Sequence, residues 1–191
     1  MKNINISTLQ DDLDSITSST VLLYPTDTIY GLGGLVTPEV VEKIMYIKQR
    51  PADKPFSIIA PSFDRVSNHF AVTSTFSEER AHRKQQFPWR WLTLLLPLLA
   101  NKEYEIDFSL ISPTPVIGIR FLDHPFQEIV TQLWKPFITT SANISWQPNI
   151  THPDQLLDVQ KQLIDFCIDE GTIDRPASVI IDYTTQEVIR G

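Results

Sequence analysis

The sequence predicts an α/β protein in which helices cover a β-sheet. Short apolar runs of strand composition alternate with segments of helical periodicity, and prolines or polar clusters separate them. The chain has 191 residues, of which 42% are hydrophobic, enough to build one sizeable core. Because no repeat, low-complexity tract or linker interrupts the pattern, we expect a single domain over residues 1–191.

Strands are predicted where β-branched and large apolar residues run together between prolines or polar clusters. These runs cover residues 21–24, 56–60, 92–96, 116–121, 137–140 and 178–182. The glycines at 31, 33 and 34 follow the first run. They predict a loop, because glycine adopts backbone conformations that other residues avoid.

Helices are predicted where apolar residues recur at intervals of three or four. The segments are 6–16, 38–50, 62–70, 76–86, 125–133 and 153–163. Ser7 and Gln10 fit a capping box in the first of them. Thr37 and Pro38 fit the N-cap and first helical positions of the second, which Pro51 ends.

Composition and charge exclude several classes of protein. The chain has 23 acidic and 16 basic residues, a net charge of −7, which argues against non-specific binding to nucleic acid or membranes. Its one cysteine, Cys167, excludes a disulfide framework, and its four histidines lack metal-ligand spacing. Neither a signal peptide nor a membrane-spanning run is visible in the sequence. We therefore expect a cytoplasmic protein in which any basic groove is local.

Three cations follow one another closely at the end of the second predicted helix. Lys48, Arg50 and Lys54 lie within seven residues, and prolines at 51 and 55 stiffen the chain between them. A solvated helix end is one interpretation, because cations are favourable at a helix C-terminus. Their mutual repulsion favours the other interpretation, a site for a polyphosphate that would relieve it.

Arg120 ends a predicted strand among apolar neighbours. A guanidinium in such a strand needs a bidentate acceptor to offset its desolvation. A ligand carboxylate and an internal Asp or Glu fit this requirement equally well.

Polar side chains also follow the other predicted strands. Thr26 to Tyr30 come after the first strand, at a position where open α/β sheets bind ligands, although Thr and Asp are also ordinary turn residues. Ser141 and Asn143 fit phosphate donors or a cap of the next segment, and Ser178 gives a similar, weaker signal. A P-loop is excluded because its glycine spacing and Gly-Lys-Ser/Thr ending are absent.

In order along the chain, these segments resemble the motifs of the YrdC/Sua5 family, the threonylcarbamoyladenylate synthases. The matching segments are Tyr24 to Gly33, Lys48-Gln49-Arg50-Pro51 with Lys54, Leu92-Thr93-Leu94, Gly118-Ile119-Arg120 and Ser141-Ala142-Asn143. The resemblance is to the short, single-domain branch of the family. It implies a twisted mixed sheet with a positively charged concave site.

The resemblance also implies a reaction and its site residues. L-threonine, bicarbonate and ATP, with Mg²⁺, would give threonylcarbamoyl-AMP and pyrophosphate for N6-threonylcarbamoyladenosine at position 37 of tRNA. A downstream threonylcarbamoyl transferase complex would receive the product. The residues carried over as ATP-binding are Lys48, Arg50, Lys54, Thr93, Ser141, Asn143 and Arg190. Those carried over as threonine-binding are Thr28, Tyr30, Arg120 and Ser178, and the catalytic set is Lys48, Arg50 and Arg120.

Tryptophans at 89, 134 and 146 depart from the family pattern, in which glycine stands at these positions. Because tryptophan adopts positive φ only at a cost, we expect at least two of these loops to be built differently, with Trp146 packed against its neighbours. The alternative function is an RNA-binding module that uses the same concavity for tRNA and has reduced or lost catalysis. A carbamoyl-transfer enzyme of hydrogenase maturation is a third candidate, disfavoured by the absence of zinc motifs.

Overall fold

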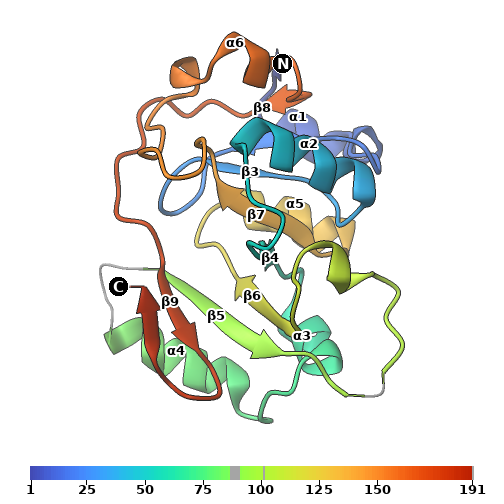
Figure 1. Cartoon of the computed structure of the whole chain (residues 1–191), viewed down its shortest axis with the longest axis vertical. Helices are drawn as coiled ribbons and strands as arrows, with labels where there is room; N and C mark the ends of the chain where they lie inside the picture. The colour runs from blue at the N-terminus through green and yellow to red at the C-terminus, as the bar shows by residue number, and fades with distance from the viewer. Residues whose placement is uncertain (87–90, 101, 191) are drawn as a thin grey trace.

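A computed structural model of the chain describes residues 1–86, 91–100 and 102–190 (Figure 1). The strands are β1 Lys2–Asn3, β2 Leu22–Tyr24, β3 Gly31–Gly33, β4 Ser57–Ile59, β5 Leu92–Pro97, β6 Val116–Arg120, β7 Phe137–Ser141, β8 Phe166–Cys167, β9 Val179–Asp182 and β10 Val188–Arg190. The α-helices are α1 Ile6–Asp11, α2 Pro38–Lys48, α3 Phe63–His69, α4 Phe76–Gln86, α5 Phe126–Leu133 and α6 Asp158–Lys161. Short 3-10 turns are η1 Leu13–Ser15, η2 Phe108–Leu110 and η3 Pro153–Gln155.

The described strands form one mixed sheet in the order β1-β8-β2-β3-β7-β4-β6-β5-β9-β10. The pairs β1–β8, β2–β8, β4–β6 and β5–β9 are parallel, and the other neighbouring pairs are antiparallel. The sheet runs through the length of the molecule, with α1, α2 and α6 near one end and α3 and α4 near the other (Figure 1). The predicted α/β fold is therefore confirmed.

Alternating strand residues separate the core into two layers. Leu23 and Ile58 belong to the cluster that contains the buried face of α2, whereas Tyr24 and Ile59 belong to the cluster that contains α1 and α5. All four of these strand side chains are buried. The helices thus cover both faces of the sheet, as sheets buried on two sides require.

The glycine segment that predicted a loop is instead strand β3. It pairs antiparallel with β2 and β7. A Cβ atom on Gly33 would lie 1.8 Å from the Ile138 carbonyl oxygen, and one on Gly31 would lie 2.7 Å from the Tyr24 ring. These glycines allow the neighbouring strand and the Tyr24 ring to approach the β3 backbone closely, and they do not form a left-handed turn. A sequence pattern does not distinguish these two roles of glycine.

Other boundaries differ for local reasons. The first helix is capped by Asn5, whose Oδ1 accepts from Thr8 N–H at 2.7 Å, rather than by the predicted Ser7 capping box. It ends at Asp11, and η1 follows. The helix predicted over 153–163 divides into η3 and α6. The predicted Thr37 cap and Pro38 start of α2 are confirmed.

Trp134 and Trp146 take the backbone conformation that glycine favours, with φ of 55° and 70°. The expectation that their loops avoid positive φ is therefore wrong for both. The expectation of a packed Trp146 is also wrong, since 82% of that residue is exposed. Trp89 lies outside the described residues.

Among the described helices, none is both long and apolar enough to span a membrane.

Candidate active site

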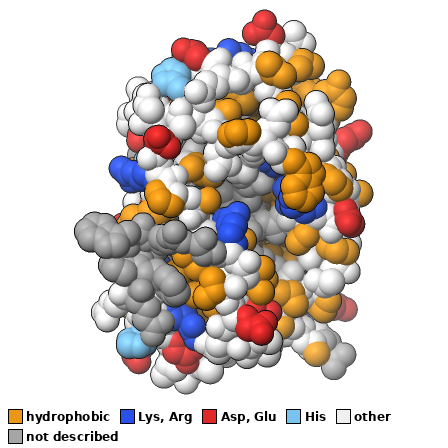
Figure 2. Space-filling view, turned by 60° about the vertical axis from the view of Figure 1, so that its left-hand side comes forward, with side chains coloured by type: hydrophobic (Ala, Val, Ile, Leu, Met, Phe, Trp, Pro, Cys, Tyr) orange, Lys and Arg blue, Asp and Glu red, His pale blue; other side chains and the backbone are white. Residues whose placement is uncertain are grey.

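A cavity of about 320 Å³ opens over neighbouring strands β3, β7, β4, β6, β5 and β9. Four of the described residues on its wall are cationic: Arg50, Lys54, Arg120 and Arg190. No acidic residue occurs among the described lining residues. A protein of net charge −7 therefore concentrates positive charge at one cavity. Figure 2 shows a hollow in one face with Lys and Arg side chains beside it.

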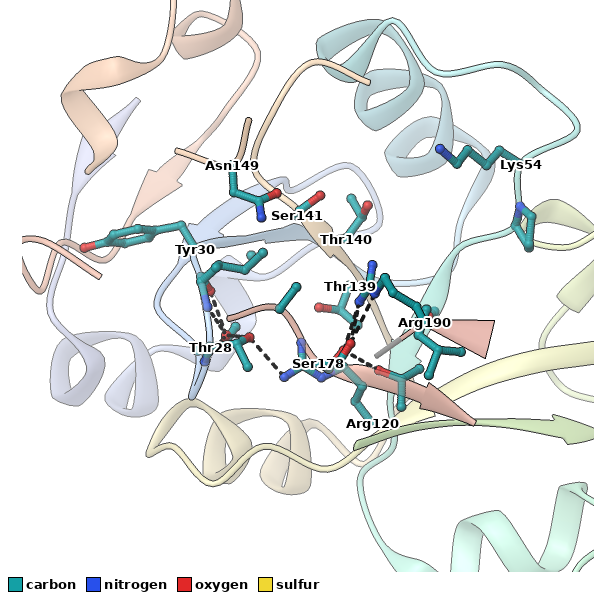
Figure 3. A pocket seen from close by; sticks show the side chains of 18 of the residues that line it. Thr28, Tyr30, Lys54, Arg120, Thr139, Thr140, Ser141, Asn149, Ser178 and Arg190 are labelled. Carbon is teal, nitrogen blue, oxygen red and sulfur yellow. Dashed lines mark hydrogen bonds between the residues drawn. The ribbon is translucent and has the colours of Figure 1, made fainter. Parts of the chain in front are cut away.

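The structure brings most of the predicted site residues to this wall. Those that line the cavity are Thr28, Tyr30, Arg50, Lys54, Thr93, Arg120, Ser141, Ser178 and Arg190. Lys48 and Asn143 are not among the described lining residues, and they lie directly behind Ser141. Segments far apart in sequence thus converge, as Figure 3 shows for Thr28, Lys54, Ser141 and Ser178.

Lys48 connects α2 to the loop after β7, behind the cavity wall. Its side chain comes from the last turn of α2 and is almost completely buried. The ammonium donates to Ser141 O, to Asn143 O at 2.9 Å and to Asn143 Oδ1 at 3.0 Å. The family resemblance implies that this charge contacts the ATP phosphates directly. The structure directs it to the carbonyl groups that shape the loop after β7.

The surroundings of Lys48 lower its pKa to about 7. The main cause is desolvation by burial, and the charges of Arg50 and Lys54 add to it. Because this pKa lies below the unfolded value of about 10.4, the unfolded chain binds more protons between about pH 7 and 10. In this window Lys48 therefore makes the folded state more stable as pH rises.

Arg50 shapes the segment that presents Lys54. Its Nε donates to Lys54 O at 3.2 Å, its Nη2 donates to Pro55 O, and its guanidinium lies 4.4 Å from the centre of the Phe56 ring. Burial lowers the pKa of Arg50 to about 10. Arg50 thereby fixes the backbone that carries Lys54.

Arg120 has an internal partner. Of the two acceptors that its sequence context allows, an internal carboxylate and a ligand carboxylate, the structure shows the internal one. Its Nη2 donates to Asp27 Oδ1 at 2.6 Å and to Thr28 Oγ1 at 3.3 Å. Asp27 is 1% exposed, and its Oδ2 accepts from Asp123 N–H at 2.8 Å. Arg120 Nε is buried and has no hydrogen-bond partner among the described residues. Arg120 also lines the cavity, so the paired guanidinium lies at its wall.

Thr93, Ser178 and Arg190 form one cluster. The hydroxyls of Thr93 and Ser178 are 2.8 Å apart, and Arg190 Nη2 donates to Ser178 O at 2.9 Å and to Ser178 Oγ at 3.2 Å (Figure 3). Burial, with the nearby charge of Arg120, lowers the pKa of Arg190. The resemblance implies that Ser178 binds threonine and that Thr93 and Arg190 bind ATP. The structure joins all three side chains by hydrogen bonds.

The Tyr30 side chain points away from the cavity (Figure 3). Its hydroxyl donates to Gly171 O at 2.8 Å and accepts from Glu170 N–H at 3.0 Å. Burial raises the pKa of Tyr30 to about 12. Tyr30 therefore anchors the segment that leads to β9, and its carbonyl accepts from Ala142 N–H at 3.0 Å beside the wall.

The sequence assigns no individual role to several wall residues. Thr139, Thr140 and Asn149 line the cavity, and Asp27 holds Arg120 from behind. The two threonines precede Ser141 in β7, so they belong to the same polar strand end as the predicted Ser141. Asn149 lies in a loop without regular structure, and no local signal distinguishes it.

No group of His, Cys, Asp or Glu suited to a metal ion occurs in the part of the chain that the structure describes. The carboxylate of Asp27, whose neighbours Thr26 and Thr28 line the cavity, is occupied by Arg120 and the Asp123 N–H. Because Mg²⁺ prefers carboxylate and other oxygen ligands, these residues do not form a resident magnesium site.

Curated relatives named threonylcarbamoyl-AMP synthase match almost the whole chain. A threonylcarbamoyl-AMP synthase of Vibrio vulnificus (strain YJ016) is 29% identical over 191 residues, covering 97% of this chain and 98% of the relative. One of Pseudoalteromonas translucida (strain TAC 125) is 27% identical, with the same coverage.

Two solved structures have the same fold. P. abyssi Sua5 complexed with L-threonine superposes with a TM-score of 0.75 and 26% identity over 96% of this chain, which spans 54% of that protein. E. coli YciO gives a TM-score of 0.76 at 20% identity over 99% of this chain and 92% of its own, a likeness of fold. The profile of the Sua5/YciO/YrdC family, described as "Telomere recombination", matches residues 14–191. The chain therefore belongs to the Sua5/YciO/YrdC family.

Proposed function

We propose that this protein is an L-threonylcarbamoyladenylate synthase, a nucleotidyltransferase that converts L-threonine, bicarbonate and ATP into threonylcarbamoyl-AMP and pyrophosphate. The observation that carries the proposal is a cavity with four cationic side chains and no acidic one among its described lining residues. Threonine, bicarbonate and ATP are all anionic or carry a carboxylate. The relatives named as threonylcarbamoyl-AMP synthases support the choice of reaction.

Arg50 and Lys54 form the end of the cavity that we assign to the ATP phosphates. Both side chains belong to the segment after α2, and both line the cavity. Ser141, on the facing strand β7, adds a hydroxyl. Lys48 and Asn143 support this end from behind through their contacts with the Ser141 loop.

Arg120 and Thr28 form the end that we assign to threonine. A carboxylate is a strong acceptor for a guanidinium, and the Arg120 guanidinium lies at the cavity wall. The P. abyssi Sua5 complexed with L-threonine shows that a family member binds this amino acid. Ser178 joins Thr93 and Arg190 at the wall of the same cavity.

The reaction needs no nucleophile from the protein. The threonine amine and bicarbonate form a carbamate with loss of water, and a carbamate oxygen then attacks the α-phosphorus of ATP. The bond from that phosphorus to the bridging oxygen breaks, and pyrophosphate leaves. The cations act by positioning the two anions and by stabilising the charge on the leaving group.

Mg²⁺ is proposed as the counter-ion that accompanies ATP, and we assign no step of the reaction to it. We further propose a cytoplasmic setting, in which a downstream transferase carries the threonylcarbamoyl group to tRNA. The RNA-binding alternative is not favoured, because the relatives are named as synthases.

Pyrophosphate release is expected to require threonine and bicarbonate together and to proceed without tRNA. Serine should be a poor substitute, because a missing methyl in a fitted pocket lowers binding by about 1 kcal/mol or more. A coupled pyrophosphate assay that omits each component in turn tests this. Release that ignores bicarbonate, or that appears only with tRNA, would contradict the synthase proposal. Steep salt dependence of tRNA binding would then support the RNA-binding alternative.

ATP binding at about pH 8.5 is expected to be accompanied by proton uptake. Lys48, with a pKa of about 7, is largely neutral at that pH, and a polyanion beside it favours the ammonium form. Calorimetric titration in Tris and in HEPES, which differ in ionisation enthalpy, measures the uptake. The variant Lys48→Met should lose it. Equal uptake in that variant would assign the proton to another group.

A further inference from the structure

The turn formed by residues 144–147 has a costly backbone. Gln147 N–H donates to Ile144 O at 3.0 Å, which closes a four-residue turn with Ser145 and Trp146 at its centre. Trp146 has φ of 70°, and the third position of such a turn favours glycine. Strained residues of this kind persist where other contacts retain them, and they concentrate at functional sites.

Burial does not offset that cost, because 82% of Trp146 is exposed. Its indole instead meets a cation of the cavity wall. Lys54 Nζ lies 3.8 Å from the centre of the ring, well inside the range of a cation–π contact. Trp146 thus joins the turn after β7 to the segment after α2, and it does so at Lys54.

The backbones on both sides of this contact are already fixed. Ser145 N–H donates to Lys48 O at 2.7 Å, and Asn143 Nδ2 donates to Gln147 O at 2.6 Å. On the other side, Arg50 Nε donates to Lys54 O at 3.2 Å. The side chains of Trp146 and Lys54 complete the connection, and lysine has a long and flexible stem.

We propose that Trp146 is a positioning residue for Lys54 and that its indole holds the ammonium at the cavity wall for a polyphosphate ligand. Without an anion, Arg50 repels Lys54, and the indole offsets this repulsion. Holding the side chain in advance reduces the ordering cost when phosphate binds. The assignment rests on the proposed function only in taking ATP as the natural ligand.

Three variants measured with inorganic tripolyphosphate test the proposal. Trp146→Leu keeps an apolar side chain without a ring face, and we expect it to weaken tripolyphosphate binding about two- to fivefold by calorimetry. Trp146→Phe keeps a ring and should bind within about twofold of the parent protein. In a Lys54→Met background, Trp146→Leu should have no further effect. Equal losses for Leu and Phe, or an undiminished loss without Lys54, would overturn the proposal.

The same variants separate this inference from the proposed function. In the pyrophosphate assay, Trp146→Leu should raise the KM for ATP by a similar factor and leave the KM for threonine unchanged. If the parent protein binds tripolyphosphate but releases no pyrophosphate, the synthase proposal fails and the positioning role is still decided by calorimetry. A parent protein that does not bind tripolyphosphate would overturn the positioning role itself.

Discussion

Replacing Asp27 with alanine is expected to lower the free energy of unfolding by about 3–5 kcal/mol. The substitution removes the carboxylate that pairs with Arg120 at 2.6 Å inside the protein and leaves a buried, uncompensated guanidinium. It also removes the acceptor of the Asp123 N–H. Urea unfolding measures the change, and Asp53→Ala, which alters an exposed carboxylate, is the matched control. Equal midpoints for the two variants would contradict the structural role of the pair.

A double variant separates stability from threonine binding. Asp27→Asn with Arg120→Met removes both charges and keeps an acceptor for the Asp123 N–H. It should recover much of the stability lost in Asp27→Ala, because apolar replacement of a buried ion pair is often neutral. Threonine binding should nevertheless be lost, by more than tenfold in calorimetry, while ATP binding changes little. Retained threonine affinity would remove Arg120 from the proposed threonine site.

Replacing Lys48 with methionine is expected to weaken ATP binding by about tenfold or more, with a smaller effect on threonine. Below about pH 7 the Lys48 side chain is an ammonium, and its contacts with the carbonyl groups of Ser141 and Asn143 are charge-assisted, worth roughly 1.5–3 kcal/mol each. Without it the loop that carries the Ser141 hydroxyl loses its fixed position, and positive charge is removed from behind the wall. The free energy of unfolding should fall as well, by about 1–3 kcal/mol for buried acceptors left unpaired.

Lys43→Met is the matched control for this experiment. Lys43 lies on the same helix, and its ammonium is 3.5 Å from Asp165 at a half-exposed site away from the cavity wall. Calorimetry with ATP and thermal unfolding of both variants compare the buried Lys48 with the partly exposed Lys43. Equal, small effects would show that Lys48 neither shapes the loop nor contributes charge.

The elements that the sequence predicts well are those with enough residues to show a period. α2 displays its cap, its proline and its apolar face, and β5, β6 and β7 each have at least five residues. β1 and β8 have two residues each, too few for an alternation to appear. β8 forms because it pairs with β2, and β1 forms because it pairs with β8. The cause is therefore tertiary contact rather than local sequence.

The site follows the same division. Residue chemistry and the ends of strands predict that Arg50, Lys54, Arg120 and Ser141 share a site, and the structure places them around one cavity. The direction of each side chain depends on partners far along the chain. Arg120 turns to Asp27, 93 residues away, and Tyr30 turns to the carbonyl of Gly171. Such pairings form only when segments distant in sequence come together in the folded protein, and they leave no local signal.

The contact between β3 and β7 limits how this cavity can change. Gly31 pairs in register with Ser141 and both line the cavity, so the strand that follows Thr28 and the strand that carries the phosphate-end hydroxyl meet across a single backbone pair. At Gly33, even a methyl group would collide with the Ile138 carbonyl, which leaves the two strands no room for a larger residue between them. The spacing of the two ends is therefore set by main chain, and a homologue could adapt to a larger amino acid only by trimming the side chains around it.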